Sequence, residues 1–382
     1  MPKEVRKLLL DTFRDGYQKA ASRRQKTKLI DDFCFATKYS RKHAIRILNG
    51  KVNPVEKGRP GPPRKYDADL CWPLFSLWND MNRICSKRMV AAIPLWLPYQ
   101  NEISSSDKKM LISMSASTID RMLKPFRKQK GVSTTRASMI KRSIPIKLLD
   151  GEVTEPGHLE SDTVSHCGSA LGGSFASSLT VTDLCTGWTE NRATESKEGE
   201  KIAEATRSVL RSLPFKTKTW SSDNGSEFIN RPVVKVLRKK GIEVQRRRPY
   251  KKNDAAHVEQ KNWTHVRQLF GYERIEDKEL VQMMNEIYQV YWSPLQNFFM
   301  PMMKLTEKTR VGGRIVKKYD LPKTPYQRVL DSGKLDLQER AHLKQRMDGK
   351  NPFYLKQELE NKLKIFFRMI ERKKIKLLEN AA

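Results

Sequence analysis

The first sixty residues repeat apolar positions with the period of an α-helix. Leu10 and Phe13, and farther along Ile30 and Phe33, lie three residues apart, which places each pair on one side of a helix. Polar residues occupy the positions between them. The pattern therefore predicts amphipathic helices that bury one apolar stripe.

A short turn then leads into another helix, for which Ser40 is a favourable N-cap and Gly50 a stop signal. The inward positions of this helix are apolar and comprise Ala44, Ile47 and Leu48. Its outer positions are basic and comprise Arg41, Lys42, His43 and Arg46. Two helices joined in this way predict a helix-turn-helix module over residues 1–52, with Arg41, Lys42 and Arg46 as DNA contacts. An ordinary basic helical hairpin is the alternative.

Residues 53–66 contain too much proline and glycine for a helix or a central strand, so they predict a linker. Within this linker Arg59, flanked by Gly58 and Pro60, resembles the core of an AT-hook. In such a hook an extended arginine lies in the narrow minor groove of A·T-rich DNA. A plain basic linker explains the composition equally well.

Residues 67–135 return to a helical pattern. Ser115 is a favourable N-cap for a short helix that ends at Pro125. This helix resembles a second recognition helix, and Ser117 and Arg121 are its expected DNA contacts. A second helix-turn-helix module is one interpretation of this region, and a structural helical subdomain is the other.

From Pro156 onward the pattern changes to short runs of apolar residues and threonine, which favour strands. The predicted elements are strands over 157–165, 174–183 and 188–194, a helix over 197–213, a strand ending at Ser222, a helix over 227–240, a strand over 242–246 and a helix over 254–270. Tight turns separate the first three strands and predict an antiparallel meander. Residues 150–275 are thus predicted to form an α/β domain on a mixed five-stranded sheet.

Residues 276–382 predict a basic C-terminal region with a small β-rich segment plus helices. Residues 310–320 predict a basic β-hairpin. The tail from Asp331 predicts an amphipathic helix, which could pack on the core, pair with another protomer or lie along DNA. The whole chain is therefore predicted to be a multidomain α+β protein.

The charge of the chain narrows the class of partner. Lys and Arg total 74 against 43 Asp and Glu, a formal net charge of +31. Such an excess repels itself in a compact chain unless a polyanion neutralises it, which points to nucleic acid. The five cysteines form no Cys-x-x-Cys pair, so we expect reduced thiols in the cytoplasm. We expect neither a signal peptide nor a membrane span.

Three carboxylates lie at informative places among the predicted elements. Asp162 lies within the first strand, Asp223 directly follows the strand that ends at Ser222, and Glu259 lies in the first turns of the last helix. A charge between core strands is costly without a cation. Carboxylates on separate rigid elements can hold two divalent ions, which activate the attacking oxygen and stabilise the leaving oxygen in phosphodiester cleavage.

Other acidic residues compete for these roles. Glu160 shares a strand face with Asp162 and is a rival ligand. Asp183 is interpreted as a turn residue and Asp254 as the N-cap of the last helix. The histidines are too dispersed along the chain to predict a metal site.

The segment from Asp223 to Phe228 matches the Asp-Asn-Gly-x-x-Phe signature of retroviral integrases and bacterial insertion-sequence transposases. Thirty-five residues separate Asp223 from Glu259, which is the D,D(35)E spacing of that superfamily. Asn262 matches the Asn of its Glu-x-x-Asn pattern. The chain thus resembles bacterial insertion-sequence DDE transposases with an RNase H-like integrase catalytic core, strongly over residues 156–270 and by architecture elsewhere.

The resemblance implies that Asp162, Asp223 and Glu259 are catalytic and bind two Mg²⁺ or Mn²⁺ ions. It implies an enzyme, a polynucleotidyl transferase that binds transposon ends, cuts the DNA there and joins the 3′-hydroxyls to target DNA. Double-stranded DNA is then the expected partner. We expect a homo-oligomer on that DNA, because two element ends must be paired, and a location in the bacterial cytoplasm with the nucleoid.

The expected DNA contacts of the catalytic core follow the fifth strand or lie on the last helix, and they are Arg246, Arg247, Arg248, Lys261, Asn262 and Arg267. For the arginine run a solvated charge run is the alternative. Retroviral integrases carry lysines at the places that Trp263 and Val266 occupy here. The resemblance therefore leaves open which basic residue touches the element end.

Two other functional classes compete with this interpretation. A DNA-binding regulator derived from a transposase would be expected to have lost catalytic carboxylates, whereas all three are present. An RNase H-like nuclease would be expected to carry a further catalytic acid and no paired DNA-reading modules. The sequence therefore favours the transposase over both.

Overall fold

The computed structural model describes residues 3–50, 66, 68–127, 153–169, 172–222, 231–246, 256–311 and 314–379. The chain divides into two compact units, Met1–Lys65 and Tyr66–Ala382, each of which is treated by itself. The central part of the second unit carries the mixed five-stranded sheet predicted from the sequence. In the described residues no helix is long and apolar enough to cross a membrane.

The first unit is helical over its described residues. It contains α1 (Lys3–Lys19), α2 (Arg23–Thr37) and α3 (Arg41–Leu48). A capping box starts α2, in which the Ser22 hydroxyl accepts a hydrogen bond from the backbone of Gln25 and the Gln25 side chain accepts one from Ser22. Ser40 is the N-cap residue of α3, although its side chain makes no capping bond. The three helices share one small core, made of Leu10, Ile30, Phe33, Ala44, Ile47 and Leu48.

Four α-helices begin the second unit: α4 (Cys71–Asp80), α5 (Ser86–Trp96), α6 (Ser105–Ile112) and α7 (Ala116–Leu123). The Ser115 hydroxyl caps α7 as expected, because it accepts from the backbone N–H of Thr118. These helices share one hydrophobic core with the rest of the unit. The Trp96 indole donates to the carbonyl of Phe299 at 3.1 Å, so the helices are tied to a segment about two hundred residues later.

The sheet contains β1 (His158–Ser165), β2 (Ser177–Asp183), β3 (Thr189–Thr194), β4 (Thr219–Ser222) and β5 (Glu243–Arg246). The strand order is β3-β2-β1-β4-β5. The first three strands are antiparallel, which confirms the predicted meander, and β4 and β5 run parallel to β1. The predicted run over 174–183 becomes a strand only from Ser177, and the residues before it connect through the backbone bond from Ala176 to Ile275.

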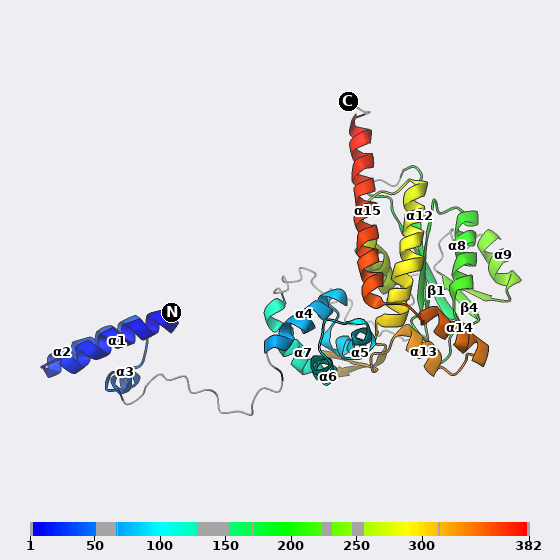
Figure 1. Cartoon of the computed structure of the whole chain (residues 1–382). Helices are drawn as coiled ribbons and strands as arrows, with labels where there is room; N and C mark the ends of the chain where they lie inside the picture. Colours follow the sequence, from blue (N-terminus) through cyan, green and yellow to red (C-terminus); the bar gives the residue numbers. More distant parts are fainter. Residues whose placement is uncertain are drawn as a thin grey trace. The chain divides into compact units, whose positions relative to one another are not determined.

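Helices cover both faces of the sheet (Figure 1). One layer contains α8 (Gly199–Ser212) and α9 (Arg231–Lys239), which connect β3 to β4 and β4 to β5. The other layer contains α12 (Lys278–Glu286) and the long α15 (Pro352–Glu379). β1 is the middle strand of the sheet, and it therefore lies between the two helical layers.

The predicted last helix of the core is present to its expected end. It consists of α10 (Ala256–Lys261), a π-helical stretch (Asn262–Arg267) and α11 (Gln268–Phe270), and residues 254 and 255 lie outside the described residues. Two further π-helical stretches, Ile287–Trp292 and Leu295–Phe299, continue α12. π-Helical turns are rare and concentrate at functional sites. The stretch Asn262–Arg267 begins three residues after Glu259, which makes this helix a candidate part of a functional site.

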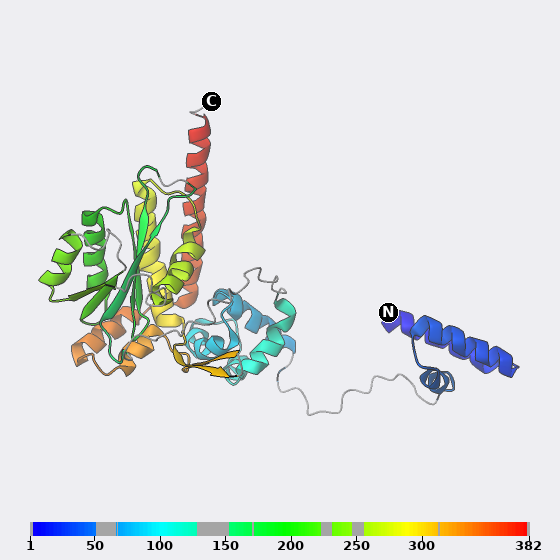
Figure 2. The same cartoon turned by 180° about the vertical axis from the view of Figure 1, so that it is seen from behind.

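The C-terminal region contains a two-stranded sheet of β6 (Leu305–Val311) and β7 (Arg314–Tyr319), which confirms the predicted hairpin (Figure 2). It is followed by α13 (Pro325–Asp331), α14 (Leu337–Met347) and α15. The tail was expected to pack on the core, to pair with another protomer or to lie along DNA, and in the structure α15 packs on the core. Phe366 of α15 is fully buried and lies edge-on to Phe270, with ring centroids 5.1 Å apart.

Candidate active site

Asp162 lies in the middle of β1, on the face that α10 covers. Its Oδ1 accepts a hydrogen bond from the backbone N–H of Thr163 at 2.8 Å. Its Oδ2 accepts one from the side-chain amide of Asn262 at 2.7 Å. Asn262 is one hundred residues later in the chain, so this contact fixes the last helix against the central strand. The carboxylate is only half-buried, unlike the side chains on either side of it along this face.

Glu160 shares the face of Asp162 but differs from it in surroundings. Its side chain is 2% exposed, and its Oε2 accepts from the backbone N–H of Val258 at 3.4 Å. That N–H belongs to the first turn of α10, where backbone donors lack partners within the helix and the helix dipole favours an anion. Glu160 thus acts as a remote N-terminal cap for the helix that carries Glu259.

Of the other two predicted carboxylates, only the backbone of Glu259 is among the described residues. Glu259 follows the buried Val258 in α10, and its backbone is helical, but its side chain lies outside the described residues. Asp223 also lies outside them. Ser222, the residue before it, ends β4 and pairs in parallel register with Ser161, the residue before Asp162.

A buried polar network lies on the strands next to Asp162. Thr180 of β2 is the cross-strand partner of Asp162, and its hydroxyl accepts from the amide of Asn191 on β3 at 2.9 Å. The side-chain oxygen Oδ1 of Asn191 lies 3.1 Å from Nδ1 of His265. Burial lowers the pKa of His265 well below its ordinary value, and the charge of Lys261 lowers it further, so the ring is neutral.

Sequence reasoning missed this network. Its signal is the spacing on the last helix, where Glu259, Asn262 and His265 recur every third residue and so share one side of the helix. The structure brings Asn262 to β1 and His265 to β3, which shows that this side of the helix lies across the strands.

Two cations, Lys261 of α10 and Arg88 of α5, lie near enough for the charge of Arg88 to act on Lys261. Burial, together with the smaller effect of the charge of Arg88 on α5, lowers the pKa of Lys261 to about 8. The guanidinium of Arg88 is itself largely desolvated and donates to the carbonyl of Pro301 at 2.5 Å. No ion pair with an acid is found for either cation in the described part of the chain. The helical region at the start of this unit therefore contributes positive charge next to the last helix.

Arg267 is held in place by the protein itself. Its guanidinium donates to the carbonyls of Ser165 and Gly271 at 3.1 and 3.2 Å. It also lies over the ring of Tyr272, 4.5 Å from the centroid. Val266 is fully buried, whereas Trp263 is 52% exposed. Lys261 is the basic residue next to Asn262 in the sequence. Arg267 has a structural role, because the protein itself binds its guanidinium.

The remaining predicted DNA contacts fall on several elements. Arg246 ends β5 and pairs with Ser222, but its side chain lies outside the described residues, as do Arg247, Arg248 and Arg59 altogether. Ser117 and Arg121 are exposed on α7. Arg41, Lys42 and Arg46 are exposed on α3, and Arg41 forms an ion pair with Asp31 of α2.

Asp183 is a structural acid, as interpreted from the sequence. It is fully buried at the end of β2 and accepts from the backbone of Gly157 at 2.8 Å. The backbone and hydroxyl of Thr186 each donate to it at 2.7 Å. Burial raises its pKa, while these bonds oppose the rise. Asp254 lies outside the described residues, and in the rest no cluster of three or more His, Cys, Asp or Glu is placed to hold a metal.

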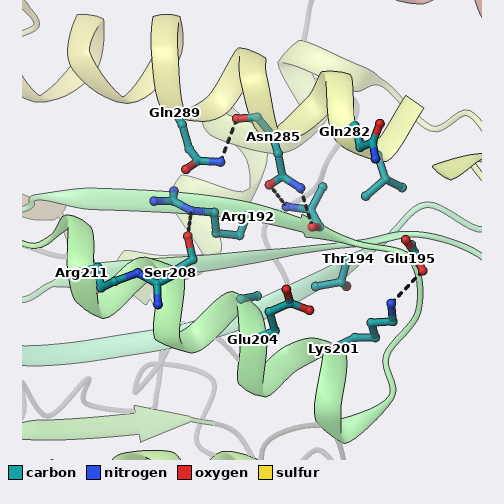
Figure 3. Close-up of a pocket in the computed structure, with 13 residues that line it drawn as sticks. Arg192, Thr194, Glu195, Lys201, Glu204, Ser208, Arg211, Gln282, Asn285 and Gln289 are labelled. Atoms are coloured by element: carbon teal, nitrogen blue, oxygen red, sulfur yellow. Dashed lines mark hydrogen bonds and ion pairs between the residues drawn. The ribbon is translucent and has the colours of Figure 1, made fainter. Parts of the chain in front are cut away.

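A pocket of about 290 Å³ lies away from these carboxylates, between the edge strand β3, α8 and α12 (Figure 3). The Asn285 amide on its wall donates to the carbonyl of Ala193 and accepts from its N–H. Asn297 makes the same pair of bonds to Thr189. The two amides replace a sixth strand, so they close the sheet edge that would otherwise be open for pairing.

The sequence of this chain is similar to an integrase domain and to a bacterial protein. A family model described as "Integrase core domain" matches residues 153–252, which carry all five strands of the sheet. The chain belongs to the retroviral integrase superfamily. It is also 36% identical over 320 residues to the uncharacterized protein y4rM of Sinorhizobium fredii (strain NBRC 101917 / NGR234), covering 81% of this chain and 91% of that protein. The integrase core thus accounts for the sheet, and the similarity to y4rM extends far into the flanking regions.

Proposed function

We propose that this protein is a DNA transposase that binds transposon ends, cuts the DNA there and transfers the 3′-hydroxyls into target DNA. The observation that carries the proposal is the bond between Asp162 and Asn262, because it joins the central strand to the helix that bears Glu259. Membership of the integrase superfamily and the net charge of +31 support the same function. We further propose that it acts as a homo-oligomer on bacterial DNA in the cytoplasm, since one active site cannot pair two ends.

The donor set fits divalent metal ions. Ser222, the residue before Asp223 in the sequence, pairs with Ser161, the residue before Asp162. Carboxylate oxygens are the ligands that Mg²⁺ and Mn²⁺ prefer, and a carboxylate has about four lone-pair sites, so oriented hydrogen bonds do not exclude a cation. We therefore propose that Asp162, Asp223 and Glu259 hold two such ions. When bound, these ions would activate the attacking oxygen and stabilise the leaving oxygen.

The residues around the carboxylates have supporting roles in this proposal. Asn262 fixes the rotamer of Asp162 through its amide. We propose that Glu160 anchors the first turn of α10 and thereby positions Glu259, because its carboxylate is 2% exposed and accepts from the backbone N–H of Val258. Lys261 and Arg88 supply positive charge that suits a DNA phosphate next to the site. We also propose that Arg246, Arg247 and Arg248, which end β5 or follow it in the sequence, contact DNA phosphates.

The test is strand transfer of a labelled oligonucleotide of the element end into plasmid DNA, with Mg²⁺ and with Mn²⁺. We expect joining by the wild type and a loss of at least a hundredfold for Asp162→Asn, Asp223→Asn and Glu259→Gln, because each removes a ligand charge. DNA binding by these variants should be unchanged. Failure of the wild type to join ends, or full activity of Glu259→Gln, would overturn the proposal.

Glu160→Gln separates a positioning residue from a ligand. The amide keeps the shape of the side chain but loses the charge at the helix end, so we expect slower joining with an unchanged concentration dependence on Mn²⁺. A ligand would instead shift the Mn²⁺ concentration needed for half-maximal activity. The other two functional classes give different outcomes in the same assay: a regulator binds ends without cutting, and a nuclease cuts without joining.

A further inference from the structure

Strands β6 and β7 form a ribbon that stands apart from the five-stranded sheet (Figure 2). Neighbouring residues on a strand point to opposite faces, and both Ile315 and Val316 are exposed, at 55% and 43%. Tyr319 at the end of the ribbon is 49% exposed. Neither face of β7 is therefore covered by the protein. An isolated two-stranded ribbon is only marginally stable in water, so this one depends on its base or on a partner.

The base of the ribbon is firmly anchored. The Asp320 carboxylate accepts from the backbone N–H of Lys304 at 2.6 Å, and the Asp320 N–H donates to the carbonyl of Lys304 at 3.0 Å. Arg328 of α13 forms an ion pair with Asp320 at 2.6 Å. A backbone bridge also pairs Met302, which precedes β6, with Lys323, which follows β7. The ribbon is thus held at one end, while the described side chains Ile315, Val316 and Tyr319 of β7 are exposed.

The ribbon is strongly basic. Between Leu305 and Tyr319 the basic residues are Lys308, Arg310, Arg314, Lys317 and Lys318, and the single acid is Glu307. Glu307 is already used, because it forms an ion pair with Lys318 at 2.6 Å. The strand register places Lys308 directly opposite Lys317. Like charges directly opposite each other destabilise a strand pair, and a bound anion removes that cost.

We propose that the β6–β7 ribbon is a DNA-binding element that enters a groove of duplex DNA, with the Lys308 and Lys317 pair at the phosphates. Three features favour this partner. A two-stranded ribbon fits the major groove, which is about 12 Å wide. Six residues of strand reach about 20 Å, enough to follow several phosphates. The exposed Ile315 and Val316 provide apolar contact for the groove, such as thymine methyl groups.

The inference rests on the proposed function, since it assumes that the protein acts on DNA. It adds a surface outside the integrase core and outside both helical regions. A DNA-binding ribbon here would let the C-terminal region hold the duplex while the carboxylates act on it.

The experiment compares full-length variants in binding to a fluorescent 30-base-pair duplex, measured by anisotropy in EDTA at several salt concentrations. The test variant is Lys308→Gln with Lys317→Gln. The matched control is Lys344→Gln with Lys364→Gln, which removes the same charge from exposed helical positions. Because each phosphate contact contributes about 0.9 to the slope of log affinity against log salt, we expect the test variant to lose about 2 from that slope. Its affinity near 100 mM salt should fall roughly ten- to a hundredfold.

A separate variant, Ile315→Ser, tests entry into a groove. We expect weaker binding with an unchanged salt slope, because it removes an apolar contact and no charge. Wild-type slope and affinity in the double lysine variant would overturn the ribbon proposal, as would equal losses in the control. If the wild type itself fails to bind duplex DNA, the proposed function fails instead. Circular dichroism of each variant confirms that a loss of binding does not reflect unfolding.

Discussion

Acid is expected to destabilise the second compact unit through His166. This residue directly follows β1 and is fully buried. Its Nε2 lies 2.8 Å from the hydroxyl of Ser178, which also accepts from the Tyr288 hydroxyl at 2.9 Å. Its Nδ1 has no hydrogen-bond partner among the described residues. Burial, together with the smaller effect of the Arg267 charge, lowers the pKa of His166 to about 3.

The sign and size of the effect follow from that pKa. The folded state keeps the ring neutral, whereas the unfolded chain binds a proton near the ordinary value of 6.5. Stability is therefore fully present above pH 6.5 and falls as the pH drops toward 3. At 1.36 kcal/mol for each pKa unit, the loss is about 3 kcal/mol at pH 4 and at most about 5 kcal/mol below pH 3. That is a large part of the 5–15 kcal/mol typical of a folded protein.

Urea unfolding at fixed pH, followed by tryptophan fluorescence, measures this loss. All seven Trp residues belong to the second unit, so the signal reports on it alone. In His166→Gln the free energy of unfolding should fall about 3 kcal/mol less between pH 7 and pH 4 than in the wild type. The control is His342→Gln, an exposed position, which should keep the full wild-type loss. A wild-type loss in His166→Gln would refute the argument that a buried neutral ring is responsible.

Two further predictions concern the frame of the sheet. Asn285→Ala should lower the free energy of unfolding by about 2–4 kcal/mol, because the N–H and carbonyl of Ala193 at the sheet edge both lose their partner. The control Gln289→Ala, which removes one exposed hydrogen bond, should cost less than about 1 kcal/mol in the same urea titration. Gly157→Ala should reduce the yield of folded protein and its melting temperature. Gly157 has a φ of +110°, and an added Cβ would lie 2.5 Å from the carbonyl oxygen of Lys216, so a normal melting temperature would contradict this prediction.

Local pattern was sufficient to predict the elements of the core. The sequence of strands and helices from His158 to Phe270 followed from alternation and turns, and the meander followed from the short connections. The basic hairpin was predicted correctly for the same reason, because alternation and turn signals are carried by neighbouring residues. The motif that begins at Asp223 and its spacing to Glu259 pointed to the integrase superfamily, which the family comparison confirms.

Burial within the sheet could not be predicted in this way. β3 has the sequence Thr-Glu-Asn-Arg-Ala-Thr, which suggests an exposed edge, yet all six residues are buried. Glu190 and Arg192 pair with each other at 3.2 Å in its interior. The cause is distant in sequence: side chains about a hundred residues later, such as Asn297, close the edge of this strand.

The sequence by itself therefore determined the family, the order of elements and the candidate carboxylates, since each depends on residues close together or on a fixed spacing. Only the tertiary structure shows what Glu160 and His265 contact. Glu160 was interpreted from the sequence as a rival ligand and His265 was not singled out, whereas the structure has them in contact with Val258 and Asn191, which lie 98 and 74 residues away along the chain. Periodicity shows which residues share a face; only the packed fold shows what that face meets.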